Sequence, residues 1–327
     1  MDAERVAQEL RRLDVGAVQQ EEPLARHTSF RIGGPAAIYL QPPNQEALVR
    51  ALDWVHREAV PYFVLGQGTN VLVSDQGLDA VVLSPSRALR YVDTKGDQLI
   101  AGAGVLLTKL AHRAHQAGLG GMEFAVSIPG TLGGALVMNA GAHGTEMKDV
   151  VRQLVVWEPG VGVRLVSSTE ADFAYRSSAF MRQKWIALEA QIELTPKDPG
   201  EILSTMRHHM EYRKRTQPVG DPNAGSVFKN PPNDYAGRLI ESLGAKGWRL
   251  GDAEVSQVHA NFIVNRGHAT AHDVLGLMRR LRHEVYARYA VQLRPEVRWI
   301  GPGEGGFEAT WENLWCEAGK GLTEPCE

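Results

Sequence analysis

Residues 121–144, GMEFAVSIPGTLGGALVMNAGAHG, contain six glycines and one proline among small, mostly apolar side chains. Pro129 and Gly130 predict a turn. Gly133 and Gly134 have no side chains to cover the backbone at the start of the next helix. The first turn of a helix carries unpaired N–H groups and a partial positive charge, so this start suits a pyrophosphate. Tight turns or close helix packing would also explain the glycines. The stretch alone leaves both interpretations open.

Two more glycine clusters precede this stretch. In LGQGTNVLVSD (65–75), Gly66 and Gly68 directly follow an apolar strand, where backbone N–H groups can approach an anion closely. The other cluster is AGAG (101–104). Neither is a Rossmann fingerprint, because Val71 stands where G-x-G-x-x-G requires its third glycine, and the sequence has no G-x-x-x-x-G-K-[ST] loop. Three clusters in one region favour nucleotide binding over unrelated turns.

Hydrophobic periodicity predicts that helices and strands alternate along the chain. The expected strands are residues 62–66, 79–84, 97–104, 151–157, 185–194, 261–265 and 296–301. The expected helices are residues 45–59, 106–119, 235–244 and 271–289, with Asn44 and Asp234 as N-caps of the first and third. In the run 185–194, Leu188, Ala190 and Ile192 share one face, which predicts an antiparallel strand buried on one side.

The composition changes at TPKDPGE (195–201). There Asp198 and Pro199 predict the start of another helix, with Ile202, Met206 and Met210 turned inward. We therefore place a domain boundary near residue 197. The expected parts are a helical segment at 1–20, a first domain at 21–197, a second domain at 198–301 and a poorly ordered tail at 302–327.

The overall composition is that of an ordinary soluble protein. The 327 residues are 43% hydrophobic and carry a net charge of −3, which argues against a nucleic-acid or membrane partner. The N-terminus has no signal-peptide core and no apolar run reaches membrane-spanning length, so a cytoplasmic location is expected. Cys316 and Cys326 fit neither a zinc pattern nor a disulfide framework and are expected to be reduced thiols.

Seven phrases of the sequence together carry a family resemblance. They are HTSFRIGGPA (27–36), LGQGTNVLVSD (65–75), the stretch 121–144, YRSSAF (175–180), NAGSVFKNP (223–231), GDAEVSQVHANFIVN (251–265) and LRPEVRWIG (293–301). In this order they resemble the UDP-N-acetylenolpyruvoylglucosamine reductases, the MurB family, over roughly residues 20–301. The last three phrases distinguish that family from other flavoenzymes of the vanillyl-alcohol oxidase type.

The resemblance implies an α+β fold. A two-lobed FAD-binding domain of the vanillyl-alcohol oxidase type would be followed by a smaller α/β substrate-binding domain. One form of the family carries an insertion after the YR motif, with a tyrosine that closes over the substrate. Here YRSSAF runs directly into the strand at 185–194, so the chain resembles the shorter form. The residue that closes the site in place of that tyrosine is left open.

The implied activity is a two-step reduction. NADPH would reduce a noncovalently bound FAD, and UDP-N-acetylglucosamine enolpyruvate would then be reduced to UDP-N-acetylmuramate for peptidoglycan synthesis. We expect a monomer without a metal site. His27 is expected to be a strand-end histidine that supports the loop rather than to attach the flavin. The implied cofactor-binding residues are Arg31, Gly66, Gly68, Thr69, Asn70, Ser127, Ile128, Gly130, Gly133 and Gly134.

Three residues match the family's catalytic positions. Arg176 would hold the substrate carboxylate and the developing enolate, Ser226 would donate a proton to carbon, and Glu296 would help to position Ser226 or a water. Each also has a structural interpretation. Arg176 could be a surface arginine, Ser226 a turn residue of NAGS, and Glu296 the ion-pair partner of a neighbouring arginine.

The substrate is also a pyrophosphate, so cations and amides are expected in the second domain. The candidates are Arg213, Lys229, Asn230 and Asn261. Arg213 belongs to the basic run RKR at a helix end, which a solvated helix C-terminus would also explain. His259 lies nearby in the sequence, and a structural role is expected for it.

Two other functions account for part of the pattern. A flavin-dependent alcohol or aldonolactone oxidase of the same fold would explain the glycine clusters but not the phrases around Ser226, His259 and Glu296. A nucleotide-binding module without chemistry would explain the clusters but not Arg176, Ser226 and Glu296 together.

Overall fold

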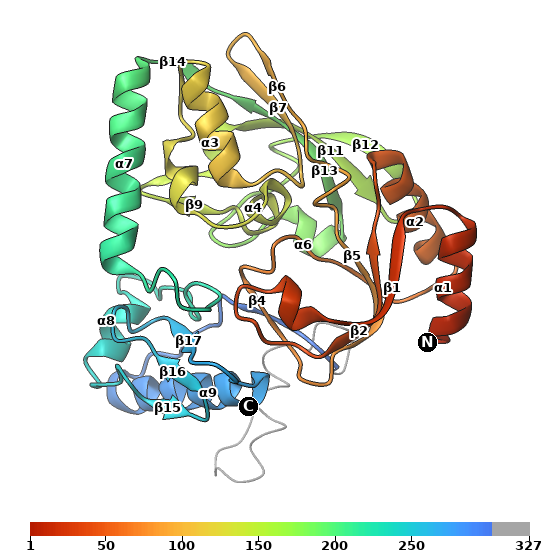
Figure 1. Ribbon diagram of the computed structural model, residues 1–327. Helices are drawn as coiled ribbons and strands as arrows, with labels where there is room; N and C mark the ends of the chain where they lie inside the picture. The colour runs from red at the N-terminus through yellow and green to blue at the C-terminus, as the bar shows by residue number, and fades with distance from the viewer. Residues whose placement is uncertain (303–327) are drawn as a thin grey trace. The chain divides into compact units, whose positions relative to one another are not determined.

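The computed structural model describes residues 1–302, so the expected tail, with Cys316 and Cys326, lies outside the described residues. The described chain forms two compact units (Figure 1). Unit 1 contains residues 1–20, 38–67 and 80–215, and unit 2 contains residues 21–37, 68–79 and the described chain from residue 216 onward. Each unit combines helices with strands, in agreement with the expected α+β fold.

The first sheet is four-stranded, with the order β1-β2-β5-β3. Its strands are β1 (Ala17–Pro23), β2 (Pro35–Gln41), β5 (Leu78–Leu83) and β3 (Tyr62–Val64). The side chain of Asn44 accepts a hydrogen bond from the N–H of Ala47 at 2.9 Å and begins α2 (Gln45–Arg57), as predicted. Helix α1 (Ala3–Arg12) buries Val6, Ala7 and Leu10 in the core of unit 1, so residues 1–20 are part of this unit and not a separate segment.

The second sheet of unit 1 is five-stranded and antiparallel, with the order β12-β11-β13-β7-β6. Its strands are β12 (Gly162–Ser167), β11 (Val151–Glu158), β13 (Ile186–Glu193), β7 (Gln98–Gly102) and β6 (Val92–Lys95). Leu188, Ala190 and Ile192 of the central strand β13 are fully buried. The antiparallel strand predicted from their alternation is confirmed.

Short elements lie between the strands of the second sheet and after its last strand. The helices are α3 (Leu107–Gln116), η2 (Glu123–Ser127), α4 (Leu132–Met138), α5 (Met147–Val150) and α6 (Ala179–Gln183). The short strands are β8 (Leu119–Gly120), β9 (Gly141–Ala142), β10 (Thr145–Glu146) and β14 (Thr195–Pro196). The glycine-rich stretch 121–144 therefore contains η2, α4 and β9.

Helix α7 (Pro199–Thr216), the long helix at the left of Figure 1, corrects the predicted domain boundary. Asp198 accepts a hydrogen bond from the N–H of Glu201 at 2.9 Å, so the helix begins as predicted. Ile202 and Met206, however, are buried in the core of unit 1. The chain consequently enters unit 2 at Thr216 and not near residue 197.

Unit 2 is built on two small sheets. Strand β4 (Val71–Val73) pairs in parallel with β18 (Arg298–Ile300), and β15 (Arg249–Leu250), β16 (Ala253–Val255) and β17 (Ile263–Asn265) form an antiparallel sheet. Helix α9 (Ala271–Tyr289) packs on this sheet, and its predicted bounds are confirmed (Figure 1). The short helix η1 (Leu24–His27) also belongs to the unit.

Helix α8 (Ala236–Glu241) of unit 2 begins differently from the prediction. Asp234, the predicted N-cap, pairs with Arg238. Tyr235 occupies the cap position, and the side chain of Asn230 accepts a hydrogen bond from the N–H of Ala236 at 3.1 Å. None of the helices within residues 1–302 combines the length and the apolar character that crossing a bilayer requires.

Trp157 ties the second sheet of unit 1 to helix α2. Its fully buried indole donates a hydrogen bond from Nε1 to Oδ1 of Asp53 at 2.7 Å, and its ring meets Tyr62 of β3 edge to face. Asp53 is exposed, so this bond joins a buried ring of the sheet to a charged acceptor at the surface of α2. This contact therefore couples the two sheets of the unit.

We predict that Asp53→Ala lowers the free energy of unfolding by about 1–3 kcal/mol, because the Trp157 N–H loses its hydrogen bond to a charged group. Urea unfolding of the wild type and the variant measures the loss. In a Trp157→Phe background the same substitution should cost much less. An equal loss in both backgrounds would contradict the assigned bond.

Candidate active site

Ser226 stands at the start of a short extended segment, residues 226–229, in unit 2. Ser226 forms an isolated β-bridge with Phe262, and the N–H of Val227 donates to the carbonyl of Asn261 at 2.9 Å. These bonds occupy one edge of the segment. Ser226 itself is half-buried, on a backbone held by these bonds.

The opposite edge of this segment bonds to the segment that carries Glu296. The N–H of Glu296 donates to the carbonyl of Val227 at 2.9 Å, and the N–H of Lys229 donates to the carbonyl of Arg294 at 2.8 Å. The structure therefore brings two of the three predicted catalytic residues, Ser226 and Glu296, into adjacent bonded segments of one unit.

Asn261 holds the same segment with its side chain. Its Oδ1 accepts from the N–H of Phe228 at 3.1 Å and its Nδ2 donates to the carbonyl of Phe228 at 2.8 Å. The side chain is almost completely buried. Asn261 was a candidate for substrate contact, but both groups of its amide already bind backbone. Its role in this structure is to position residues 226–229.

His259 in turn positions Asn261. Its Nδ1 accepts the N–H of Asn261 at 3.2 Å, which requires a neutral ring with its proton on Nε2. Burial lowers the pKa of His259 below its ordinary value of 6.5, which favours the same neutral form. The expected structural role of this histidine agrees with these contacts.

Asn70, predicted for the cofactor loop, contacts the segment of Glu296. Its Nδ2 donates to the carbonyl of Glu296 at 3.3 Å, and its own carbonyl accepts the N–H of Arg298 at 3.0 Å. These bonds extend the parallel pairing of β4 with β18. Asn70 and the segment with Glu296 therefore share one hydrogen-bonded frame within unit 2.

Arg176 lies in unit 1, at the tip of a tight turn. Ala174 and Ser177 exchange backbone hydrogen bonds at 2.9 and 3.1 Å, and Arg176 adopts a left-handed φ of +52°. The guanidinium lies over the ring of Tyr175, 5.1 Å from its centroid. Left-handed conformations are uncommon for residues other than glycine and cluster at functional sites, where the surrounding structure holds them.

Asn139 holds the turn of Arg176, and the sequence reasoning missed it. Its Nδ2 donates to the carbonyl of Ala174 at 3.2 Å and to Glu146 at 2.9 Å, and its Oδ1 accepts the N–H of Lys148 at 3.0 Å. Asn139 is fully buried and left-handed, with φ at +42°. An asparagine directly after the short run LGGALVM, a helix C-cap position, is the sequence signal that could have found it.

Two of the predicted cofactor segments meet in unit 1. A Cβ on Gly66 would lie 2.8 Å from Oγ1 of Thr131, the N-cap of α4, so the loop after β3 reaches α4 only with glycine at this position. The same Oγ1 accepts the N–H of Gly134 at 3.4 Å. At the other end of the turn, the hydroxyl of Ser127 donates to the carbonyl of Phe124 at 3.0 Å.

The start of α4 differs from the bare helix end that the sequence suggested. The N–H groups of Leu132 and Gly133 donate to the carbonyls of Val105 and Ala103, both at 2.8 Å. A Cβ on Gly133 would lie 3.2 Å from the Cβ of Ala103. Close packing therefore accounts for Gly133. Ile128, Gly130 and Gly134 surround this start as half-buried or exposed positions.

The remaining predicted cofactor residues belong to unit 2. Gly68 has φ at +60°, and a Cβ there would lie 2.3 Å from the carbonyl of His27. The hydroxyl of Ser29 lies within hydrogen-bond distance of the carbonyls of Gly68 at 3.2 Å and Asn223 at 2.6 Å. The HTSF motif thus supports the loop that continues into Thr69, while Arg31 is exposed. Nε2 of His27 lies 3.0 Å from a carboxylate oxygen of Glu22.

The predicted substrate contacts are divided between the units. Arg213 lies on α7 in unit 1, and its buried Nε has no hydrogen-bond partner among residues 1–302. Burial lowers the pKa of Arg213. Lys229 and Asn230 lie in unit 2, where the Oδ1 of Asn230 is used by α8. Within the described part of the chain, no group of three or more His, Cys, Asp or Glu is placed to hold a metal.

We predict that the free energy of unfolding falls as the pH drops below about 6.5. One reason is that His259 binds a proton at a higher pH in the unfolded state than in the folded state, where its pKa is lowered. A pKa that folding lowers by one unit corresponds to about 1.4 kcal/mol of stability lost at low pH. Urea unfolding from pH 5 to pH 7.5 measures this, and His259→Gln should flatten the profile. His143, whose pKa is also lowered, remains in both proteins, so the difference isolates His259. Identical profiles would contradict a half-buried, neutral ring at position 259.

Two family descriptions match the chain. Residues 36–163 match the FAD binding domain, and residues 217–300 match the C-terminal domain of UDP-N-acetylenolpyruvoylglucosamine reductase. The second match begins where the chain enters unit 2 for the last time and contains Ser226 and Glu296.

Individual relatives span nearly the whole chain. UDP-N-acetylenolpyruvoylglucosamine reductase 2 of Symbiobacterium thermophilum is 48% identical over 90% of this chain and 96% of its own. The reductase of Bacillus subtilis is 39% identical over 91% and 99%. The crystal structure of the Thermus caldophilus MurB has a TM-score of 0.74 at 36% identity, over 86% of this chain and 98% of that one. The chain therefore belongs to the UDP-N-acetylenolpyruvoylglucosamine reductase family.

Proposed function

We propose that this protein reduces UDP-N-acetylglucosamine enolpyruvate to UDP-N-acetylmuramate with electrons from NADPH, as a step of peptidoglycan precursor synthesis. The observation that carries this proposal is the bonded pair of segments that presents Ser226 and Glu296 within the matched C-terminal domain. Two relatives that align with this chain over at least nine-tenths of their own length support the proposal.

The residues of the predicted cofactor loops fit an FAD. Gly66, Gly130 and Gly134 carry no side chains, and a Cβ on Gly134 would meet only Oγ1 of Thr131, at 3.7 Å. A pyrophosphate can approach such a surface closely. Gly68, Thr69 and Asn70 of unit 2 are proposed as FAD contacts as well, together with Arg31, Ser127, Ile128 and Gly133. When bound, FAD supplies hydride transfer from NADPH to the enolpyruvyl group.

The chain's own residues manage the charge and the proton of the second half-reaction. Hydride addition to the terminal alkene carbon leaves negative charge on the adjacent carbon, next to the substrate carboxylate. Arg176 is proposed to hold that carboxylate and the developing enolate. The hydroxyl of Ser226 is proposed to give its proton to the carbanionic carbon. Glu296 is proposed to orient Ser226 or a water that restores the proton.

The uridine diphosphate of the substrate requires cations of its own. Arg213 is the favoured candidate, because its buried Nε has no partner within residues 1–302 and such a group is costly unless a ligand pairs with it. Lys229 directly follows the clamped Phe228 and is proposed to contact the same phosphates. Asn230 has an amide nitrogen in addition to the oxygen that α8 uses, and it is retained as a weaker candidate.

We predict that Ser226→Ala slows reoxidation of the reduced flavin by the enolpyruvyl substrate by about 10²–10⁴-fold, the usual contribution of a general acid. Reduction of the flavin by NADPH should proceed at the wild-type rate, since that half-reaction does not use this proton. Stopped-flow absorbance measures both halves. The exposed Ser204→Ala serves as the matched control and should behave as wild type.

Two results of this experiment would reject parts of the proposal. Equal slowing of both half-reactions by Ser226→Ala would remove the proton-donor role. A wild-type flavin that an alcohol reduces and NADPH does not would favour the flavin oxidase of the same fold.

We predict that Arg213→Leu raises the KM for the UDP substrate by roughly 10- to 150-fold, the equivalent of a lost hydrogen bond to a charged group. The rate of flavin reduction by NADPH should not change. The exposed neighbour Lys214→Ala controls for general electrostatic attraction. An equal rise of KM in both variants would contradict a specific contact of Arg213 with phosphate.

A further inference from the structure

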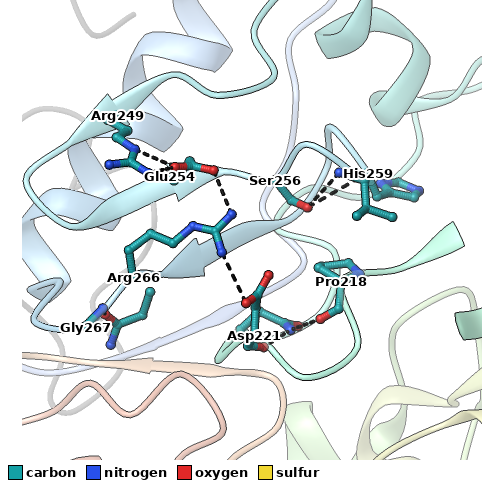
Figure 2. A network of polar contacts seen from close by, with 11 residues as sticks. Pro218, Asp221, Arg249, Glu254, Ser256, His259, Arg266 and Gly267 are labelled. Carbon is teal, nitrogen blue, oxygen red and sulfur yellow. Dashed lines mark hydrogen bonds and ion pairs between the residues drawn. The ribbon is translucent and has the colours of Figure 1, made fainter. Parts of the chain in front are cut away.

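A buried carboxylate anchors a chain of ion pairs in unit 2. The side chain of Glu254, on β16, is 4% exposed and lies between two guanidinium groups (Figure 2). Arg249 of β15 binds one of its oxygens, and Arg266, which follows β17, binds the other at 2.8 Å. The hydrogen bond from Arg266 is the largest cause that lowers the pKa of Glu254. The carboxylate is therefore charged and holds Arg266 in place.

Arg266 has a second partner outside the sheet. Its other terminal nitrogen lies 3.1 Å from Oδ1 of Asp221, in the loop that precedes Ser226 (Figure 2). The side chain of Asp221 is 41% exposed, and Arg266 is 33% exposed. One guanidinium thus bridges a buried carboxylate of the sheet and a half-exposed carboxylate of the loop.

Hydrogen bonds within the loop connect Asp221 to Gly225, the residue before Ser226. Nδ2 of Asn223 donates to the carbonyl of Asp221 at 2.7 Å, and Oδ1 of Asn223 accepts the N–H of Gly225 at 2.9 Å. The carbonyl of Pro222 accepts the N–H of Asn265 at 2.9 Å. The hydroxyl of Ser29 contacts the carbonyl of Asn223, and Ala224 is buried in the core of unit 2. Arg266 adds an ion pair to these attachments of the loop.

We propose that Arg266 is a positioning residue for Ser226, acting through Asp221 and the loop 221–225. This inference rests on the proposed proton-donor role of Ser226. The frame formed by Asn261 and Glu296 fixes the residues after Ser226, and the bridge from Glu254 through Arg266 fixes the residues before it. Proton transfer to carbon requires both, because a displacement of about 1 Å can cost roughly 100-fold in rate.

The test compares Arg266→Ala and Asp221→Ala with Arg249→Ala in the flavin-containing protein. The first two break the bridge, and the third removes the other cation from the same carboxylate without touching the loop. We expect the first two to slow flavin reoxidation by the enolpyruvyl substrate by roughly 10- to 100-fold, with unchanged reduction by NADPH. Their solvent deuterium isotope effect on reoxidation should rise, because proton transfer becomes slower. Arg249→Ala should match the wild type in every rate.

Asp221→Asn provides a conservative rescue, since its amide oxygen can still accept from Arg266. It should recover most of the rate that Asp221→Ala loses. Asp221 is half-exposed, so we expect its variants to fold. They therefore test the positioning role even if Arg266→Ala folds poorly. Combined with Ser226→Ala, Asp221→Ala should cause no further loss, as expected for residues that act through one group.

Each alternative result overturns a defined claim. Wild-type reoxidation in Asp221→Ala, beside slow reoxidation in Ser226→Ala, would reject the positioning role and keep the proposed function. Additive losses in the double variant would show that Asp221 acts independently of Ser226 and would also reject it. Wild-type reoxidation in Ser226→Ala itself would reject the proton donor, and the positioning role with it.

Discussion

The buried amide of Asn261 is the interaction on which the candidate active site depends. It binds the backbone of Phe228 by both its N–H and its carbonyl, as a neighbouring strand would. The segment 226–229 therefore keeps an extended form although it belongs to no sheet of regular strands. Its hydrogen bonds to the segment of Glu296 then set the spacing of two catalytic candidates.

Buried polar groups repeatedly perform this task in the molecule. Asn139 satisfies three backbone and side-chain partners beside the turn of Arg176, and Glu254 satisfies two guanidinium groups beside the loop of Ser226. Such networks contribute little net stability, because desolvation offsets most of the attraction. Their value lies in excluding other arrangements, since a partly broken network is costly in a buried site.

Elements with strong periodicity could be predicted from the sequence. Strand β13 and helices α2 and α9 have the alternation or the caps that their structure requires. The domain boundary could not, because Ile202 and Met206 show an apolar helix face without showing which core buries it. Likewise, nothing local indicates that β4 will pair with β18, more than two hundred residues later.

The candidate active site, like the fold, could be predicted only in part. Family motifs located Arg176, Ser226 and Glu296, whose residue types suit the chemistry. Their supporting side chains were misread or missed, since Asn261 was assigned to substrate and Asn139 was not considered. A motif states which residues recur together, but the partner of a buried amide depends on the backbone that the fold brings beside it.

The pairing of β18 with β4 has a consequence for the order in which the protein can be made. The chain passes between the units at residues 20/21, 37/38, 67/68, 79/80 and 215/216, so unit 2 is assembled from three separate stretches. Its strand β4 is synthesised early but gains its partner only when residues 298–300 leave the ribosome. Until then, the early stretches of unit 2 lack this partner, whereas unit 1 contains no residue beyond 215. A contact of such sequence separation makes folding slow, and it prevents unit 2 from existing as a transferable module.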